Sequence, residues 1–180
     1  GNDVATYPFG RGSSGCRVQY VYDTAALQAA GITSPVRIDS IAWRSNGGAS
    51  LAGGSYSGAS VTLKLGTCAF DHLALSNTFA ANFATWTSWT LGPVVVGAGA
   101  GTTPNVFTTA LTIPGGFFYD PTAGDDLVVE VAFSGSTWTG NSGNSTASSM
   151  DVVSGASIGA SRLFASSPGL PSTSRQYGKA

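Results

Sequence analysis

Residues 127–133 read LVVEVAF, and this stretch decides the fold of the chain. Its apolar side chains recur at every second position, so an extended strand places four of them on one face. These four are Leu127, Val129, Val131 and Phe133. Glu130, the only glutamate of the chain, falls on the opposite face. The alternation predicts a β-strand with one apolar face, and it is the strongest such signal in the 180 residues.

Shorter segments of the same kind lie on both sides of this strand, separated by Gly, Ser, Pro and Asn. We expect strands at Arg17–Asp23, Val36–Arg44, Ala59–Thr67, Trp86–Val96, Val106–Ile113, Met150–Val153 and Ile158–Ala165. Thr24–Ala30 is the only helical stretch, with Asp23 or Thr24 as its N-cap and Gly31 at its end. Because no crossover helices join the strands, a parallel sheet is disfavoured. The pattern predicts one all-β domain over residues 1–180, an antiparallel two-sheet sandwich of jelly-roll or Greek-key type with one short helix.

Two of the expected strands carry a local irregularity. In Val36–Arg44 the apolar phase changes between Ile38 and Ile41, which indicates a bulge near Asp39–Ser40. The Gly92–Pro93 pair interrupts a later strand, because proline cannot donate a hydrogen bond to a neighbouring strand.

Charge is scarce in this chain. Charged residues make up 9% of it, with 8 Lys+Arg, 9 Asp+Glu and a net charge of −1, while 25 Gly, 24 Ser, 24 Ala and 19 Thr account for about half. Nucleic-acid binding and a polybasic membrane-surface site are disfavoured, because both need clustered Lys and Arg. No apolar run has the length of a membrane span, so we expect no membrane insertion. A neutral polar surface is typical of secreted β-proteins and tolerates protein contact, which predicts an extracellular or cell-surface location.

The two cysteines, Cys16 and Cys68, fit the same expectation. In a secreted chain, two cysteines most simply form one disulfide, which we predict here; the alternative is two buried free thiols. The sequence has neither a CxxC motif nor a Cys/His cluster, so no zinc site is predicted.

Two parts of the sequence carry a family resemblance. RVQYVYDTAAL at Arg17–Leu27 is followed by RIDSIAWRSN at Arg37–Asn46, and FFYDPTAGDDLVVEVAFSG spans Phe117–Gly135. Together they resemble β-sandwich domains of bacterial secreted surface proteins, especially exosortase-sorted (PEP-CTERM-like) proteins. The resemblance implies a β-sandwich located outside the cell, and it implies no particular reaction.

Few residues are available for catalysis or metal binding. His72 follows Asp71, but a Ser/His/Asp triad cannot be inferred from their proximity in a chain so rich in hydroxyls, and we expect a loop or partly buried histidine. Asp120, Asp125 and Asp126, in the turn YDPTAGDD, form a weak candidate Ca²⁺ site. The alternative is that these aspartates cap backbone N–H groups of the turn.

Four tryptophans are candidate platforms for sugar rings. Trp138 lies in the polar segment STWTGNSGNS and is the best exposed candidate. Trp86 and Trp89 are three residues apart, so in a strand they face opposite sides, one of them toward the core. The alternative is that the tryptophans fill the core or a contact between subunits.

The N-terminal segment, residues 1–15, is compatible with an extended conformation. We expect it either to pair with the sheet edge of a neighbouring subunit, by strand addition, or to pack on its own sheet. The predicted contact residues are Val4, Ala5, Thr6, Tyr7 and Phe9.

These observations rank three functions. The first is a non-enzymatic extracellular structural subunit that self-assembles through strand edges into a filament or surface layer. The second is a secreted carbohydrate-binding module with a polysaccharide partner. The third is a secreted hydrolase, which would need paired carboxylates around Glu130 or the Asp120–Asp126 turn. No cofactor other than the weak Ca²⁺ site is predicted.

Overall fold

The fold is taken from a computed structural model of the 180-residue chain. It describes residues 3–5, 7–9, 15–44, 54–57, 60–97, 106–134, 137–140, 150–152, 155, 158–167, 169, 172 and 174–177.

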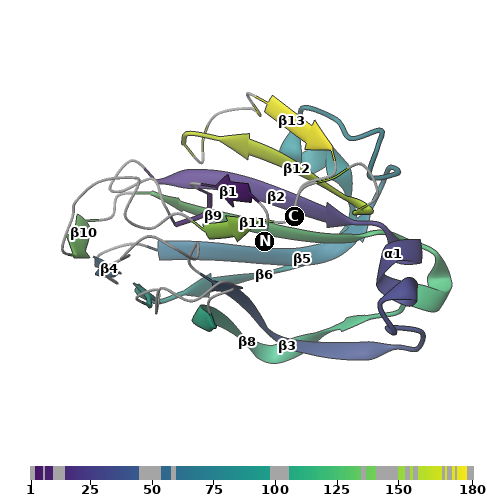
Figure 1. Ribbon diagram of the computed structural model, residues 1–180, viewed down its shortest axis with the longest axis horizontal. Coiled ribbons are helices and arrows are strands. Elements are labelled where there is room, and N and C mark those ends of the chain that lie inside the picture. Colours follow the sequence, from purple (N-terminus) through teal and green to yellow (C-terminus); the bar gives the residue numbers. More distant parts are fainter. Residues whose placement is uncertain are drawn as a thin grey trace.

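The largest layer is a six-stranded antiparallel sheet with the strand order β13-β12-β2-β9-β5-β6. Its strands are β2 (Cys16–Tyr22), β5 (Ser60–Cys68), β6 (Phe83–Leu91), β9 (Leu127–Ser134), β12 (Ala160–Ala165) and β13 (Ser174–Tyr177). β9, the strand of the LVVEVAF segment, lies in the middle between β2 and β5 (Figure 1). The stretch with the strongest alternation therefore forms the centre of the fold.

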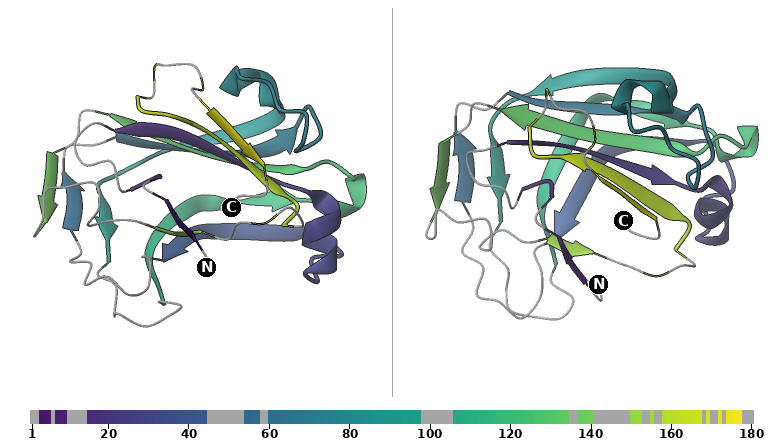
Figure 2. Two further views of the ribbon diagram at one scale, coloured as in Figure 1. Left: turned by 45° about the horizontal axis from the view of Figure 1, so that its top comes forward. Right: turned by 90° about the horizontal axis from the view of Figure 1, so that it is seen from above.

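A second layer packs on one face of this sheet. It contains the pair β3 (Val36–Arg44) and β8 (Phe107–Tyr119), and the three-stranded order β10-β4-β7. The last three strands are β10 (Thr137–Gly140), β4 (Gly54–Ser57) and β7 (Val94–Val96). In Figure 2 the β3–β8 pair runs beneath the six-stranded sheet, which gives the predicted all-β, antiparallel sandwich.

Short elements complete the chain. Helix α1 (Thr24–Ala29) begins where predicted, and the Asp23 carboxylate caps it by accepting the N–H of Ala25. The 3₁₀ turns are η2 (Phe79–Asn82) and η3 (Pro121–Ala123), and β1 (Asp3–Ala5) pairs with β11 (Met150–Val152). α1 lies at one end of the molecule, and β4 and β10 lie at the other (Figure 1).

The predicted irregularities are confirmed. The β3–β8 register shifts between Ile38 and Ser40, and most of the extra length is in β8, because Ile38 pairs with Phe117 and Ser40 with Thr112. Gly92–Pro93 separates β6 from β7. Since these two strands belong to different layers, the Gly-Pro step carries the chain from one sheet to the other.

The main apolar core lies between the two layers. On the six-stranded sheet it contains the predicted face of β9 together with the matching faces of β2 and β5. From the second layer, β4, β7 and β8 contribute buried side chains, including Tyr56, Val94 and Leu111. Trp89 packs on this core and donates its indole N–H to the carbonyl of Pro114, whereas Trp86 points to the other side and is 56% exposed. The opposite orientation of these two tryptophans is thus confirmed.

The outer face of the six-stranded sheet is also buried over part of its area. The segment between β5 and β6 folds back across it and inserts Leu75 and Phe79. These two side chains form a second apolar cluster with Val21, Cys68, Val128, Leu163 and Ala165.

The predicted disulfide is wrong, because both cysteines are free and buried. Cys16 lies in the main core and pairs with Phe133 at one end of β9, whereas Cys68 follows the pair Thr67–Leu127 at the other end and faces the outer cluster. Six residues of strand, roughly 20 Å, separate those two ends. A disulfide needs Cα atoms within about 7 Å on one side of a sheet, so this pair cannot form one.

Candidate functional site

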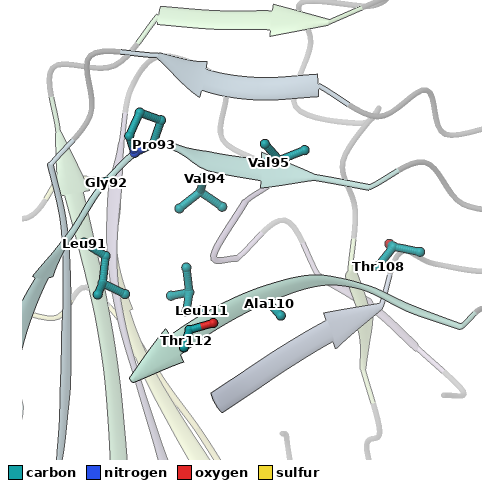
Figure 3. Close-up of a pocket in the computed structure, with 9 residues that line it drawn as sticks. All are labelled: Leu91, Gly92, Pro93, Val94, Val95, Thr108, Ala110, Leu111 and Thr112. Carbon is teal, nitrogen blue, oxygen red and sulfur yellow. The ribbon is translucent and has the colours of Figure 1, made fainter. Parts of the chain in front are cut away.

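Two strands of the second layer face each other without pairing as strands. In the part of the chain that the structure describes, β7 pairs as a strand only with β4, and β8 only with β3. Each strand therefore has one edge without a strand partner among the described residues. The two free edges belong to neighbouring parts of the same layer and bound a groove (Figure 3).

The groove is closed at one end by Gly97. Its N–H donates to Oγ1 of Thr109 at 3.2 Å, and its carbonyl accepts from Oγ1 of Thr108 at 3.3 Å. A Cβ added to Gly97 would lie 2.3 Å from Cβ of Thr108, so only glycine permits this approach. From this contact the two strands diverge (Figure 3).

The space between the diverging strands has a volume of about 480 Å³ and no charged residue in its lining. Val94 and Leu111 are buried and point into it from the two sides, whereas Val95, at the rim, is 68% exposed (Figure 3). The complete lining is Leu91, Gly92, Pro93, Val94, Val95, Thr108, Ala110, Leu111 and Thr112. Apolar walls between two free strand edges suit an extended peptide, which would bring its own backbone donors and acceptors.

The predicted subunit-contact segment lies elsewhere, packed against its own chain. β1, which contains Val4 and Ala5, pairs with β11, and Tyr7 and Phe9 are buried in the main core. The Tyr56 hydroxyl donates to the Phe9 carbonyl at 2.5 Å. Thr6 lies outside the described residues. Within the single chain this segment pairs with β11 and packs in the core, where Tyr7 and Phe9 are buried. Its contact with a neighbouring subunit stays a prediction.

The aspartates of the predicted Ca²⁺ site do not converge. Asp120 caps η3 by accepting the N–H and the hydroxyl of Thr122, and these bonds lower the pKa of its carboxyl group. The backbone carbonyl of Asp125 accepts from the Tyr119 hydroxyl. Asp126 is bound by the backbone N–H groups of Thr24 and His72, each at 2.9 Å. Of the three side chains, that of Asp120 caps a backbone N–H group of the turn, as the alternative interpretation expects, whereas that of Asp126 binds N–H groups of two distant segments.

Asp126 instead belongs to a group that the sequence analysis missed. Asp23, His72 and Asp126 each offer one ligand atom, and these atoms lie within 4.8 Å of one another. The residues come from the end of β2, the segment after β5 and the start of β9, so no local motif links them. The only available signal was that His72, the single histidine, stands beside an aspartate.

Glu130 is buried in a network of hydrogen bonds and ion pairs. It is 1% exposed, and its carboxylate accepts from the Arg17 guanidinium at 3.0 Å and from the Gln19 amide at 3.0 Å. The Lys64 ammonium lies 3.6 Å away. Asn82 extends the network by donating to Gln19 at 2.9 Å. The carboxylate is enclosed by its own partners, so the contacts of Glu130 favour a role in holding the outer face together.

The remaining sugar-platform candidate, Trp138, lies on β10, where its backbone pairs with Tyr56. The described part of the structure does not include its side chain. Trp43 packs edge-on against Phe9 in the core, with ring centroids 5.2 Å apart. Among the tryptophans whose side chains are described, Trp86 is therefore the exposed one.

Comparison of the chain with protein-family models, with curated proteins and with solved structures gives no match. Among the described residues, no helix has the length and apolar character needed to cross a bilayer.

Proposed function

We propose that this protein is a non-enzymatic extracellular structural subunit that associates with copies of itself through the groove between β7 and β8. A strand of a second copy enters the groove and adds to one or both free edges. The observation that carries the proposal is the pair of strand edges that face each other across an uncharged groove and have no strand partner within the described ranges. Strand addition of this kind is head-to-tail and does not close, so it extends into a filament or layer.

The chemistry around the groove supports a second copy as the occupant. Natural sheet edges are commonly protected by Lys, Pro or inward charges, and the only such residue in this lining is Pro93, at one end. Val106 and Phe107, at the start of β8, are 63% and 65% exposed. The chain as a whole has a net charge of −1, so two copies approach with little repulsion.

The extracellular location rests on the composition and on the family resemblance. The disulfide that was expected to support it is absent. Immunogold labelling of the producing cells tests the location directly, and exclusively internal label would contradict it.

Association is tested by light scattering behind size exclusion over a wide concentration range, together with negative-stain imaging. We expect concentration-dependent oligomers that form open chains. The variant V95K/T112K places two charges on residues that line the groove and should weaken association on the order of tenfold or more.

The matched control is F118K. Phe118 lies on β8, as Thr112 does, but outside the groove, and its side chain is 74% exposed. It should associate as the unsubstituted chain does. A monomer at all concentrations would refute the self-assembly proposal. Association that survives V95K/T112K but is lost in F118K would place the contact elsewhere.

One observation favours carbohydrate binding as the second candidate function. Trp86, on the edge strand β6, exposes its ring, and the Lys64 ammonium lies 5.0 Å from the ring centroid. An exposed indole beside a hydrogen-bond donor suits a sugar ring. Binding of polysaccharides that quenches tryptophan fluorescence and is lost in W86A would support this function. Retained binding in W86A would remove Trp86 as the platform.

A further inference from the structure

We infer that Asp23, His72 and Asp126 form a binding site for a divalent transition-metal ion of the zinc class. The site lies at the α1 end of the sandwich, where Asp23 caps the helix, away from β4 and β10 (Figure 1). It is independent of the proposed self-assembly.

The three potential ligand atoms are already close together. All lie within 4.8 Å of one another, and Nδ1 of His72 is 3.7 Å from Oδ2 of Asp126. Four-coordinate zinc, with bonds of about 2.0–2.2 Å, holds neighbouring ligand atoms roughly 3.3 Å apart. A contraction of up to about 1.5 Å between ligand atoms therefore converts the group into three ligands, and one coordination position remains for water.

Nδ1 of His72 is the atom that indicates a ligand. It is inaccessible to solvent and has no hydrogen-bond partner, although 13% of the side chain is exposed. The carboxylate oxygens nearest to it, on Asp71 and Asp126, are 3.6 and 3.7 Å away, too far for a hydrogen bond. A buried ring nitrogen without a partner is costly, and a metal ion between it and the carboxylates would satisfy it.

The two carboxylates are held in place by backbone groups. Oδ1 of Asp126 accepts the N–H of Thr24, and Oδ2 accepts the N–H of His72 itself. Oδ1 of Asp23 accepts the N–H of Ala25 at 3.0 Å, which leaves its other oxygen available. Such outer hydrogen bonds fix the orientation of metal ligands and raise affinity.

The local charge also favours a cation. Asp71 and Asp125 line a cavity of about 300 Å³ beside Asp126, which offers a path for entry. With Asp23, they bring four aspartates close to the proposed site. Among the described ion pairs, none joins a lysine or arginine to these four carboxylates.

The donor set distinguishes among metals. Ca²⁺ and Mg²⁺ prefer oxygen ligands, whereas an imidazole with carboxylates suits Zn²⁺ and its neighbours in the first row. Bound there, the ion would join the end of β2, the segment after β5 and the start of β9. That segment covers the outer face of the large sheet, so the ion would act as a structural cross-link.

The test uses the full chain without a polyhistidine tag, stripped of metal and titrated calorimetrically with ZnCl₂, CaCl₂ or MgCl₂. We expect one Zn²⁺ per chain, a higher melting temperature with Zn²⁺, and little response to Ca²⁺ or Mg²⁺. H72A keeps the backbone N–H that binds Asp126 and should weaken Zn²⁺ binding by about 100-fold or more. The matched control D39N removes one negative charge at an exposed position and should bind Zn²⁺ normally.

A second readout does not depend on a variant. Because His72 is the only histidine, the ring-nitrogen NMR signals of the unsubstituted chain report on it alone, and Zn²⁺ should shift the Nδ1 signal in a stoichiometric titration. Absence of Zn²⁺ binding, or binding that leaves this signal unchanged, would overturn the inference. Ca²⁺ binding that H72A leaves intact would also overturn it, since it would indicate an oxygen-only site.

Discussion

The inner face of the six-stranded sheet is buried by the second layer, and the outer face is buried over part of its area by different means. The inner face packs on the second layer through apolar side chains such as Leu63, Val131 and Phe133. The outer face is covered by a segment of irregular structure, and beside its small apolar cluster it buries Glu130 with Arg17. The same strands thus support a dry core on one side and a hydrogen-bonded network on the other.

This difference between the faces follows from a buried charged network around Glu130 on the outer face. Glu130 is flanked across the strands by Gln19 on β2 and Lys64 on β5, so the sheet register itself delivers its partners. The Arg17 guanidinium also lies over the Phe79 ring, at 4.5 Å from its centroid, which ties the covering segment to the network. The covering segment is therefore held by polar contacts as well as by Leu75 and Phe79.

The largest loss of stability is expected from substitutions on the inner face. F133A removes a ring that is 2% exposed and lies 4.9 Å from the Tyr56 ring, and should lower the free energy of unfolding by about 3–5 kcal/mol. V128A, on the outer face of the same strand, should cost about 2 kcal/mol, because Val128 is fully buried there. Urea unfolding measures both. A cost near zero for V128A would mean that the covering segment does not bury this face in solution.

The polar network should give the next largest effect. E130Q leaves the Arg17 guanidinium without its carboxylate, and we expect a loss of about 3 kcal/mol, because the Glu130 side chain is 2% exposed and that of Arg17 20%. The control is D39N, which breaks the exposed Arg37–Asp39 pair and should cost less than about 1 kcal/mol. Equal costs for the two substitutions would contradict the burial of the Glu130 network.

Alkaline pH should lower the stability of the fold mainly by ionising tyrosines that are buried on the inner face. Burial raises the pKa of Tyr20, and raises that of Tyr22 to about 12 from the ordinary value of 10.0. Because the unfolded chain ionises first, their contribution to stability is complete below about pH 10 and is lost as the pH rises toward 12. Urea midpoints measured across this range should fall, and less steeply in Y22F. Y177F, on the exposed residue of β13, is the control, and a fall as shallow in Y177F as in Y22F would contradict the assignment.

The smallest effect on stability concerns the cysteines, which lie on opposite faces. A reductant should leave the melting temperature unchanged, and the unreduced, unfolded chain should titrate as two free thiols. In the native protein both should react slowly, since both are buried and burial raises the pKa of Cys68. If the unreduced, unfolded chain gave no free thiol, the two cysteines would be disulfide-bonded and the assignment of free thiols would be wrong.

The assignment of some side chains to the two faces of the sheet can be predicted from the sequence. The alternation in LVVEVAF placed Val131 and Glu130 on opposite faces, and the spacing of Trp86 and Trp89 did the same on β6. The same reasoning separates the cysteines, because Cys16 is in phase with the inward Val18, whereas Cys68 is out of phase with the inward Leu65. The disulfide was predicted from the number of cysteines, which carries no information about faces.

Other features left no trace in any local pattern. The Asp23–His72–Asp126 group joins residues from three distant segments, and the groove depends on which edges β7 and β8 leave unpaired. The alternation of apolar residues along a strand shows which side chains can turn inward. It does not show which other strand will pair with it. These sites became visible only when the pairing of the strands was known.

The sequence by itself determined the all-β class, the apolar face of the central strand 127–133, the start of the helix at Asp23 or Thr24 and the break at Gly92–Pro93, because each depends on residues a few positions apart. The tertiary structure decided which strands became neighbours, how the segment after β5 came to cover the outer face, and where the aspartates and His72 met. The physical reason is one of range. Backbone geometry and local hydrogen bonds act between near neighbours in the chain, whereas burial of apolar surface rewards any arrangement that removes it from water.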